Sequence, residues 1–308
     1  MDLKGGKTLL IANPAAQRGN GAEAARVVHR LLVEWLGEDQ VGFEATLRPG
    51  HAADLAEAAK GSYDTVIALG GDGVVHEVVN GLMRVPAEAR PRFGLVPVGS
   101  GNDYARTLGM SERVSEVMAQ FYDAPEVAVD VGVCNGEYFA ETLSFGLDAA
   151  IALDTVDRRM RTGEQGTILY LKSGLGQLFR HLDTFTAKAT LDGERSFEVP
   201  IHMLAVQNGA TYGGGFRICP EADPSDGVLD ICYAKAPMSI PEATFKFLRA
   251  KDAHHTKYKG IYFDRASSID LSFDRRPPCQ IDGEPHIADS YHIRVEPKAL
   301  RVLAPALG

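Results

Sequence analysis

Residues 69–82 read LGGDGVVHEVVNGL, and this stretch decides the fold of the first half of the chain. The apolar run 65–69 (TVIAL) comes directly before it and reads as a buried strand. Apolar residues then share one helical face: Val74, Val75, Val78, Val79 and Leu82. A strand, a glycine turn and a helix in this order are typical of a parallel α/β sheet. Such turns usually hold phosphate, so the acid Asp72 at its centre needs an explanation.

Neither common phosphate-binding motif fits this turn. A dinucleotide fingerprint (GxGxxG) needs a third glycine where His76 stands, and a Walker loop needs a Lys and a Ser or Thr that are missing. A Mg²⁺ ion between Asp72 and a phosphate would turn their repulsion into attraction. We therefore interpret the turn as a site for a nucleotide and Mg²⁺. From this motif alone, the alternative is a plain glycine turn in which Asp72 caps the helix.

The first 110 residues alternate strand and helix signals. Apolar runs predict strands at 7–12, 41–47, 65–69 and 93–98, and helices between them, such as 22–36. Because these runs are continuously apolar, they predict a parallel sheet that is covered on both faces. We expect an α/β nucleotide-binding domain over residues 1–128, to which the C-terminal residues 299–308 return.

The pattern changes at about residue 128. Strands are predicted at 126–134, 138–142, 184–191, 197–206, 228–233, 260–263, 268–273 and 291–295. Asn135-Gly136, Asp192-Gly193 and Asp282-Gly283 suit hairpin turns. One helix is predicted, over residues 167–181. We therefore expect a mainly β, antiparallel, sandwich-like domain over residues 129–298.

Composition and charge exclude several classes of protein. The net charge of −9 makes nucleic acid a poor partner, since duplex binding needs a clustered basic field. No stretch approaches the roughly 18 apolar residues of a transmembrane helix, and the run 9–12 is too short for a signal peptide. The four scattered cysteines lack the spacing of a zinc site. We expect a cytoplasmic protein whose membrane contact is peripheral.

Further motifs follow the other predicted strands in a fixed order. They read NPAAQRGNG (13–21), GGDG (70–73), GSGNDYAR (99–106), YFAETLSFGLDA (138–149), QNGATYGGGFRICPEADPSDGVLD (207–230) and QIDGEP (280–285). In these motifs the chain resembles the bacterial diacylglycerol kinases, soluble lipid kinases related to sphingosine and ceramide kinases. GGDG is shared with NAD kinases and phosphofructokinases, whereas GSGND is far more specific. The resemblance covers essentially the whole chain and implies an NAD kinase/diacylglycerol kinase-like N-terminal domain.

The resemblance also implies ATP as co-substrate and Mg²⁺ as cofactor. Carried over by motif, the residues that bind the nucleotide are Asn13, Gly19, Thr46, Gly70, Gly71, Asp72, Gly73, Ser100, Asn102 and Asp103. Asp72 would hold the Mg²⁺, with Asp103 and Asp130 in an acidic network near the ion. Glu284 matches the general base of the family, and phosphoryl transfer to a hydroxyl does need such a base. Without the other motifs, 282–284 would be read as a simple hairpin turn.

A second Mg²⁺, with a structural role, is implied for the EADPSDGVLD segment. By that match Asp226 supplies its side chain, while Asp223 and Val228 supply main-chain carbonyls. The alternative is an Asp-Gly turn without metal. Two positions depart from the family pattern: Val74 stands where Thr is common, and Glu141 where Asn is usual.

The function implied is transfer of the ATP γ-phosphoryl group to a lipid hydroxyl, with diacylglycerol as first choice and phosphatidic acid as product. Another lipid alcohol, such as a sphingoid base, is one alternative, and a catalytically weak nucleotide- or lipid-binding regulator is another. The lipid would be met at a membrane surface, and the chain could form a homodimer. Basic clusters at 158–161 and 246–259 could face anionic headgroups or only solvent. The apolar segment 168–182 could line an acyl groove or pack in a core.

Overall fold

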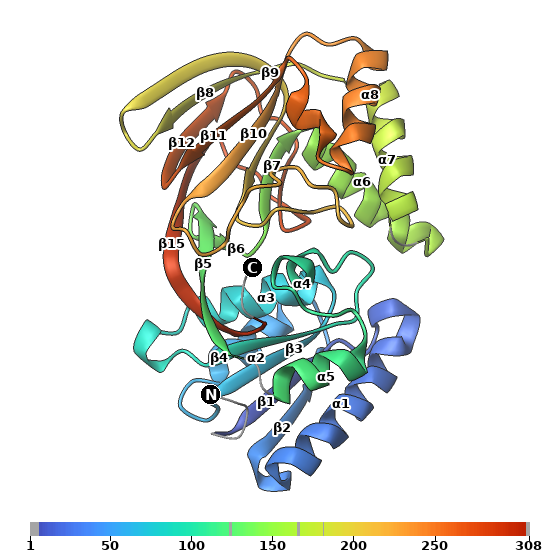
Figure 1. Ribbon diagram of the computed structural model, residues 1–308, viewed down its shortest axis with the longest axis vertical. Coiled ribbons are helices and arrows are strands. Elements are labelled where there is room, and N and C mark those ends of the chain that lie inside the picture. The colour runs from blue at the N-terminus through green and yellow to red at the C-terminus, as the bar shows by residue number, and fades with distance from the viewer. Residues whose placement is uncertain (1–5, 123–124, 165–166, 181, 306–308) are drawn as a thin grey trace. The chain divides into compact units, whose positions relative to one another are not determined.

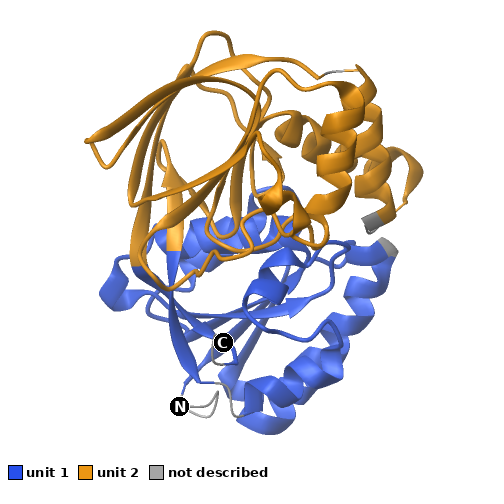
Figure 2. Ribbon diagram, turned by 45° about the horizontal axis from the view of Figure 1, so that its top comes forward, with its two compact units in different colours: residues 1–130, 298–308 blue, residues 131–297 orange. Residues whose placement is uncertain are grey.

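The chain divides into two compact units. The computed structural model describes residues 6–122, 125–164, 167–180 and 182–305. Unit 1 comprises residues 1–130 and 298–308, and unit 2 comprises residues 131–297 (Figure 2). Two strands have residues in both units: β5 (Glu126–Cys134) and β15 (Ser290–Leu303).

Unit 1 is built on a parallel sheet with the strand order β2-β1-β3-β4. Its strands are β1 (Thr8–Ala12), β2 (Val41–Ala45), β3 (Thr65–Gly70) and β4 (Arg92–Pro97). Every residue of β1, β3 and β4 is buried, as their apolar sequences require. The end of β15 joins the sheet parallel to β4, where Val302 lies opposite Phe93.

Helices cover both faces of this sheet. The α-helices are α1 (Asn20–Leu36), α2 (His51–Ala58), α3 (Asp72–Met83), α4 (Asp103–Thr107) and α5 (Val114–Tyr122). Short 3₁₀ turns are η1 (Ala16–Gly19), η2 (Glu38–Gln40) and η3 (Ala87–Ala89). Helix α1 contacts α5 on one face, and α2 contacts α3 on the other (Figure 1). The prediction of a parallel α/β sheet is confirmed.

Unit 2 is mainly β, and each described pairing among its strands is antiparallel. Its further strands are β6 (Glu137–Phe139), β7 (Thr142–Gly146), β8 (Phe185–Leu191), β9 (Arg195–Gln207), β10 (Leu229–Lys235), β11 (Ile261–Ala266), β12 (Ser268–Phe273), β13 (Cys279–Ile281) and β14 (Glu284–Pro285). Strand β9 organises the unit, since residues 195–201 pair with β8 and residues 203–207 lie between β7 and β10. The antiparallel prediction is also confirmed.

The prediction of a single helix in unit 2 is wrong. The described residues form three α-helices, α6 (Leu147–Thr162), α7 (Thr167–Arg180) and α8 (Ile240–Ala250), and the turn η4 (His254–Lys257). His181, the last residue of the predicted helix, lies outside the described residues. Helix α8 had a readable start, because Ser239 accepts a hydrogen bond from Glu242 N and Pro241 occupies the first turn. The three helices lie side by side on one flank of the strands (Figure 1).

Candidate functional site

Asp72 ties together two loops at the carboxyl end of the unit 1 sheet. It is the first residue of α3, and Gly71 rather than Asp72 occupies the N-cap position. Its Oδ1 accepts a hydrogen bond from Asp103 N at 3.0 Å, and its Oδ2 accepts one from Asn102 N at 3.0 Å. The carboxylate therefore binds the loop after β4. Ligands of parallel sheets bind at this edge.

The glycines of both loops are required because backbone or side-chain atoms lie close to them. A Cβ added at Gly99 would lie 2.5 Å from Gly71 Cα. A Cβ at Gly101 would lie 2.4 Å from Asp72 Oδ2. At Gly70 it would lie 2.7 Å from a γ-carbon of Val74, whose side chain is buried. A side chain is thus excluded at each of these three positions, which allows the two loops to pack closely at the end of the sheet.

The loop after β4 is shaped by Asn102, which adopts the left-handed conformation with φ 55° and ψ 36°. Its side chain accepts a hydrogen bond from Gly99 N at 2.8 Å and donates one to Gly99 O at 3.1 Å. Gln17 Nε2 also donates to Gly99 O, at 2.7 Å. No sequence signal distinguished Gln17 within its motif. Ser100 Oγ is buried without a hydrogen-bond partner among the described residues, which suits a ligand contact.

The predicted residues that follow β1 and β2 lie at the same edge of the sheet. Asn13 N donates to Leu69 O at 3.0 Å, and Asn13 Oδ1 accepts from Ala15 N at 3.0 Å. Thr46 N donates to Ala12 O at 2.8 Å. Gly19 has φ 98°, a conformation that favours glycine, and comes directly before α1. Unit 1 therefore brings its predicted nucleotide residues to the ends of adjacent strands.

Glu77 was missed by sequence reasoning, although it fixes a neighbouring helix. From α3, its two carboxylate oxygens accept hydrogen bonds from Gly50 N at 2.8 Å and Ala52 N at 3.0 Å. These amides belong to the N-terminal turn of α2, which has no side-chain cap of its own. Glu77 thus links α3 to the loop that carries Thr46. Helical periodicity alone gave no reason to single it out.

The two acids of the expected network have partners in unit 1. Asp103 Oδ1 lies 3.0 Å from Arg106 Nη1, and Arg106 also contacts Glu112 at 2.5 Å. Asp130 is fully buried, and its Oδ1 accepts a hydrogen bond from Lys298 N at 2.7 Å. Lys298 has φ 51°, so Asp130 stabilises a strained turn within β15.

Glu284 lies at the start of β14, and its side chain is exposed. The hairpin that carries it is anchored by Asp282, which accepts backbone hydrogen bonds at 2.8–3.1 Å from Ala140, Glu141 and Thr142. Gly283 N donates to Gln280 Oε1 at 2.6 Å. A rigid hairpin therefore presents a solvated carboxylate, which suits a proton acceptor. The Asp-Gly signal indicated the turn but not the anchoring by Asp282.

Glu141, one of the two departures from the family pattern, is buried beside the 207–209 loop. A Cβ added at Gly209 would lie 2.3 Å from Glu141 Oε1. The Glu141 carbonyl also accepts hydrogen bonds from Asn208 N at 2.9 Å and Gly209 N at 3.4 Å. Because Gly209 has no side chain, it leaves room for the Glu141 side chain, which is larger than the Asn usual in the family.

In the segment expected to hold the structural Mg²⁺, the carboxylates contact an arginine of the neighbouring strand β11. Asp226 forms an ion pair with Arg265, whose Nε also lies 3.4 Å from Asp230 Oδ1. Asp226 Oδ1 further accepts from Val228 N at 3.2 Å, and Asp223 Oδ1 accepts from Ser225 N at 2.9 Å. Within the described residues, no three His, Cys, Asp or Glu side chains are grouped to hold a metal. Because the guanidinium already supplies the positive charge, this donor set does not fit a divalent cation.

An apolar cavity of about 70 Å³ lies inside unit 2, between its helices and β9 and β10. Leu147, Ile151, Tyr170, Leu182, Met203, Ile218, Met238, Phe247 and Ile261 supply most of its apolar lining. Among its few polar groups, Asp148 has a pKa raised to about 7 by burial, and the Tyr170 hydroxyl lies 3.5 Å from its Oδ1. A hydrogen bond from Cys219 lowers the pKa of the Cys232 thiol. An apolar cavity with few polar groups suits a hydrophobic ligand.

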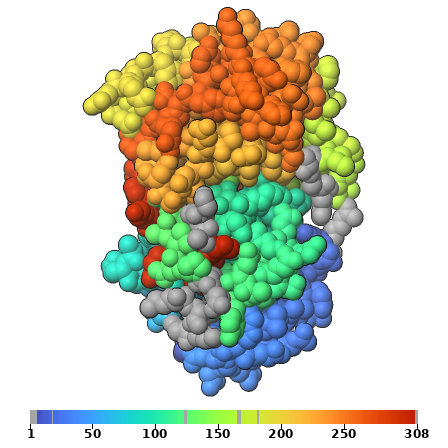
Figure 3. Space-filling view, viewed as in Figure 1, coloured from blue at the N-terminus to red at the C-terminus, as the bar shows by residue number. Residues whose placement is uncertain are grey.

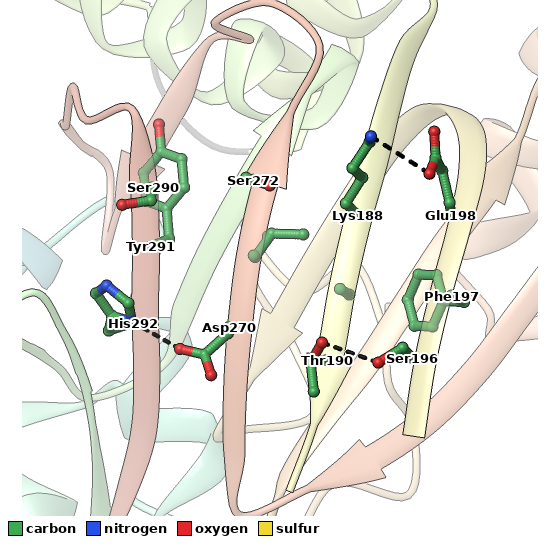
Figure 4. Close-up of a pocket in the computed structure, with 12 residues that line it drawn as sticks. Lys188, Thr190, Ser196, Phe197, Glu198, Asp270, Ser272, Ser290, Tyr291 and His292 are labelled. Carbon is green, nitrogen blue, oxygen red and sulfur yellow. Dashed lines mark hydrogen bonds and ion pairs between the residues drawn. The ribbon is translucent and has the colours of Figure 1, made fainter. Parts of the chain in front are cut away.

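A second, open hollow lies on the outer face of β8, β9, β12 and β15, with a volume of about 440 Å³ (Figure 4). Its charged side chains pair across strands. Lys188 lies 3.4 Å from Glu198, and His292 Nδ1 lies 2.6 Å from Asp270. Such paired, exposed groups are typical of a solvated sheet face, so this hollow adds nothing to the functional site.

Comparison with known proteins follows the division into two units. Residues 7–134 match the diacylglycerol kinase catalytic domain, and residues 141–304 match the YegS C-terminal NAD kinase beta sandwich-like domain. A protein of Chromohalobacter salexigens described as "Probable lipid kinase YegS-like" is 32% identical over 266 residues, 84% of this chain and 82% of that one. The diacylglycerol kinase of Bacillus subtilis is 29% identical, over 80% of this chain and 81% of its own.

Solved structures share the fold. A diacylglycerol kinase from Bacillus anthracis superposes with a TM-score of 0.76 at 24% identity, covering 98% of both chains. An NAD kinase from Archaeoglobus fulgidus gives a TM-score of 0.56 at 11% identity, covering 97% of this chain and 94% of its own.

The matched catalytic domain and the curated relatives define an enzyme of the kinase class. The chain belongs to the family of YegS-like lipid kinases and bacterial diacylglycerol kinases, as its motifs predicted. Among the described residues, no helix has the length and apolarity needed to cross a bilayer.

Proposed function

We propose that this kinase transfers the γ-phosphoryl group of ATP to the hydroxyl of diacylglycerol, giving phosphatidic acid, with Mg²⁺ as cofactor. The observation that carries the proposal is the carboxylate of Asp72, held between two glycine loops by the amides of Asn102 and Asp103. Phosphoryl transfer depends on positioning and charge neutralisation, and this arrangement suits both. The reaction would take place at the cytoplasmic surface of a membrane, with the protein bound peripherally.

The residues around Asp72 fit a bound Mg²⁺. Each carboxylate oxygen accepts a backbone N–H group, so the carboxylate is held in place beside the two glycine loops. Gly101 keeps the space beside Oδ2 free of a side chain. Asp72 would therefore hold the ion, which when bound neutralises phosphate charge. Backbone amides of the two loops and the free Ser100 hydroxyl would bind phosphate oxygens.

Unit 2 would supply the general base and the binding site for the lipid. Glu284 would take the proton of the lipid hydroxyl, since its carboxylate is exposed on an anchored hairpin. The apolar cavity lined by Tyr170, Met203 and Phe247 would receive part of an acyl chain. Diacylglycerol is placed first because the matched N-terminal domain and the Bacillus subtilis relative carry that name. A sphingoid base or another lipid alcohol remains the competing acceptor.

The test is radiolabelled phosphate transfer from ATP with Mg²⁺ to diacylglycerol, sphingosine and ceramide in mixed micelles, with identification of the products. We expect phosphatidic acid as the main labelled lipid. A labelled sphingoid base without phosphatidic acid would replace diacylglycerol as the substrate. Protein that binds ATP but labels no lipid would contradict the enzymatic proposal and favour a regulator.

A further inference from the structure

Large apolar side chains are exposed on the outer faces of α7 and α8. Ile168 and Phe179 of α7 are 70% and 67% exposed, and Phe245 of α8 is 50% exposed. Ile168 and Phe179 lie eleven positions apart, about three helical turns, and so share one face of α7. The half-buried Leu171 and Leu175 fall between them on that face. An exposed apolar surface of this kind marks an interaction site.

Helices α7 and α8 pack against each other. A Cβ added at Gly174 of α7 would lie 2.2 Å from the ring of Phe247 on α8, so the helices pack closely. Their inner side chains Tyr170 and Phe247, with ring centroids 6.2 Å apart, belong to the core beneath. In the space-filling view, the yellow-green and orange atoms of this region form the molecular surface (Figure 3). The outer side chains Ile168, Phe179 and Phe245 therefore do not pack in the core of unit 2.

Positive charge accompanies the apolar side chains. Residues 167–180 contain Lys172 and Arg180 and no acid, and residues 240–259 contain five Lys or Arg and two acids. Together they hold seven bases and two acids, a net charge of +5 in a chain whose total is −9. Arg180, Arg249 and Lys257 are exposed, whereas Lys172 is paired with Glu164 at 2.7 Å. A basic and apolar helix face complements an anionic lipid surface.

We propose that the α7–α8 face, defined by Ile168, Leu175, Phe179, Phe245 and Leu248, docks on an anionic membrane. The apolar side chains would enter the boundary between headgroups and acyl chains, while Arg180 and Arg249 would contact lipid phosphates. The inference rests on the proposed function, because a diacylglycerol acceptor resides in a bilayer. The inner side of the same helices lines the apolar cavity, so docking would place the cavity behind the membrane contact.

Sedimentation of the full chain with vesicles tests the docking surface. The vesicles are phosphatidylcholine alone, or with phosphatidylglycerol at roughly 3:1. We expect wild type to bind the anionic vesicles about tenfold more tightly, and I168S/F179S to lose about tenfold of that affinity. Phe43→Ser is the matched control, because Phe43 is 44% exposed on β2 of unit 1. The proposal is overturned if I168S/F179S sediments like wild type, or if wild type binds both vesicles equally.

A kinase assay separates this proposal from the proposed function. With a short-chain diacylglycerol present as monomers, I168S/F179S should match the turnover of wild type, since neither side chain lines the cavity. With long-chain diacylglycerol in anionic vesicles, its rate should fall about tenfold. Loss of both activities would point to damage of the fold and overturn the proposal. Sedimentation needs no ATP, so docking can hold even if no diacylglycerol is phosphorylated.

Discussion

Gly101→Ala is expected to lower both the activity and the stability of the protein. An added Cβ at this position would lie 2.4 Å from Asp72 Oδ2, whereas ordinary contacts begin near 3.4 Å. The carboxylate must therefore move by about 1 Å, because the alanine itself fits the backbone, whose φ is not in the left-handed region. That movement breaks the 3.0 Å hydrogen bond from Asn102 N, at a cost of about 1.5–3 kcal/mol in unfolding free energy.

The same displacement should lower kcat/KM by about 100-fold, since a 1 Å misplacement of a positioning group has an effect of that order. Lipid kinase assays and urea unfolding of the same preparation measure the two effects. Gly176→Ala is the control, since an added Cβ there meets only a guanidinium nitrogen of Arg158, at 3.3 Å. Gly99→Ala provides the contrast, because its neighbour is the backbone of Gly71 and cannot move aside as a carboxylate can. Wild-type turnover and stability in Gly101→Ala would refute the role given to Asp72.

Three further predictions concern unit 2. Glu284→Gln should lower turnover by about 10²–10⁴-fold while ATP affinity by calorimetry stays unchanged, and normal turnover would exclude Glu284 as the base. In the absence of ATP, the wild-type melting temperature should not respond to EDTA, and a large effect would favour a resident metal. Arg265→Gln should become more stable with added Mg²⁺, because Asp226 and Asp230 then lack their cation. Burial raises the pKa of Asp148 from 3.8 to about 7, so between these pH values the folded state binds a proton that the unfolded state has lost. The free energy of unfolding therefore falls as the pH rises from 3.8 to about 7. Asp148→Asn should flatten this slope in denaturant titrations between pH 4 and 8, and an unchanged slope would contradict the assignment.

Much of the fold could be predicted because the signals were local. Continuous apolar runs predicted β1, β3 and β4, and the strand at 126–134 agrees with β5 in both bounds. Helices α6 and α8 were missed, because α6 follows β7 without an intervening loop and α8 is short. Helical periodicity is weak evidence over such segments. The strong cue at Ser239, Pro241 and Glu242 was available and unused.

The sequence by itself determined the α/β and antiparallel classes, the family and the glycine loops, because these depend on residue type and spacing along the chain. Only the tertiary structure decided which groups meet. In the tertiary structure, Asp72 accepts hydrogen bonds from the amides of Asn102 and Asp103. Asp130 accepts a hydrogen bond from Lys298 N, and Arg265 forms an ion pair with Asp226. Partners thirty or more positions apart are brought together by strand order and packing, for which the intervening sequence carries no local signal. The acid that first looked misplaced in a phosphate loop is thus explained by a loop thirty residues further on.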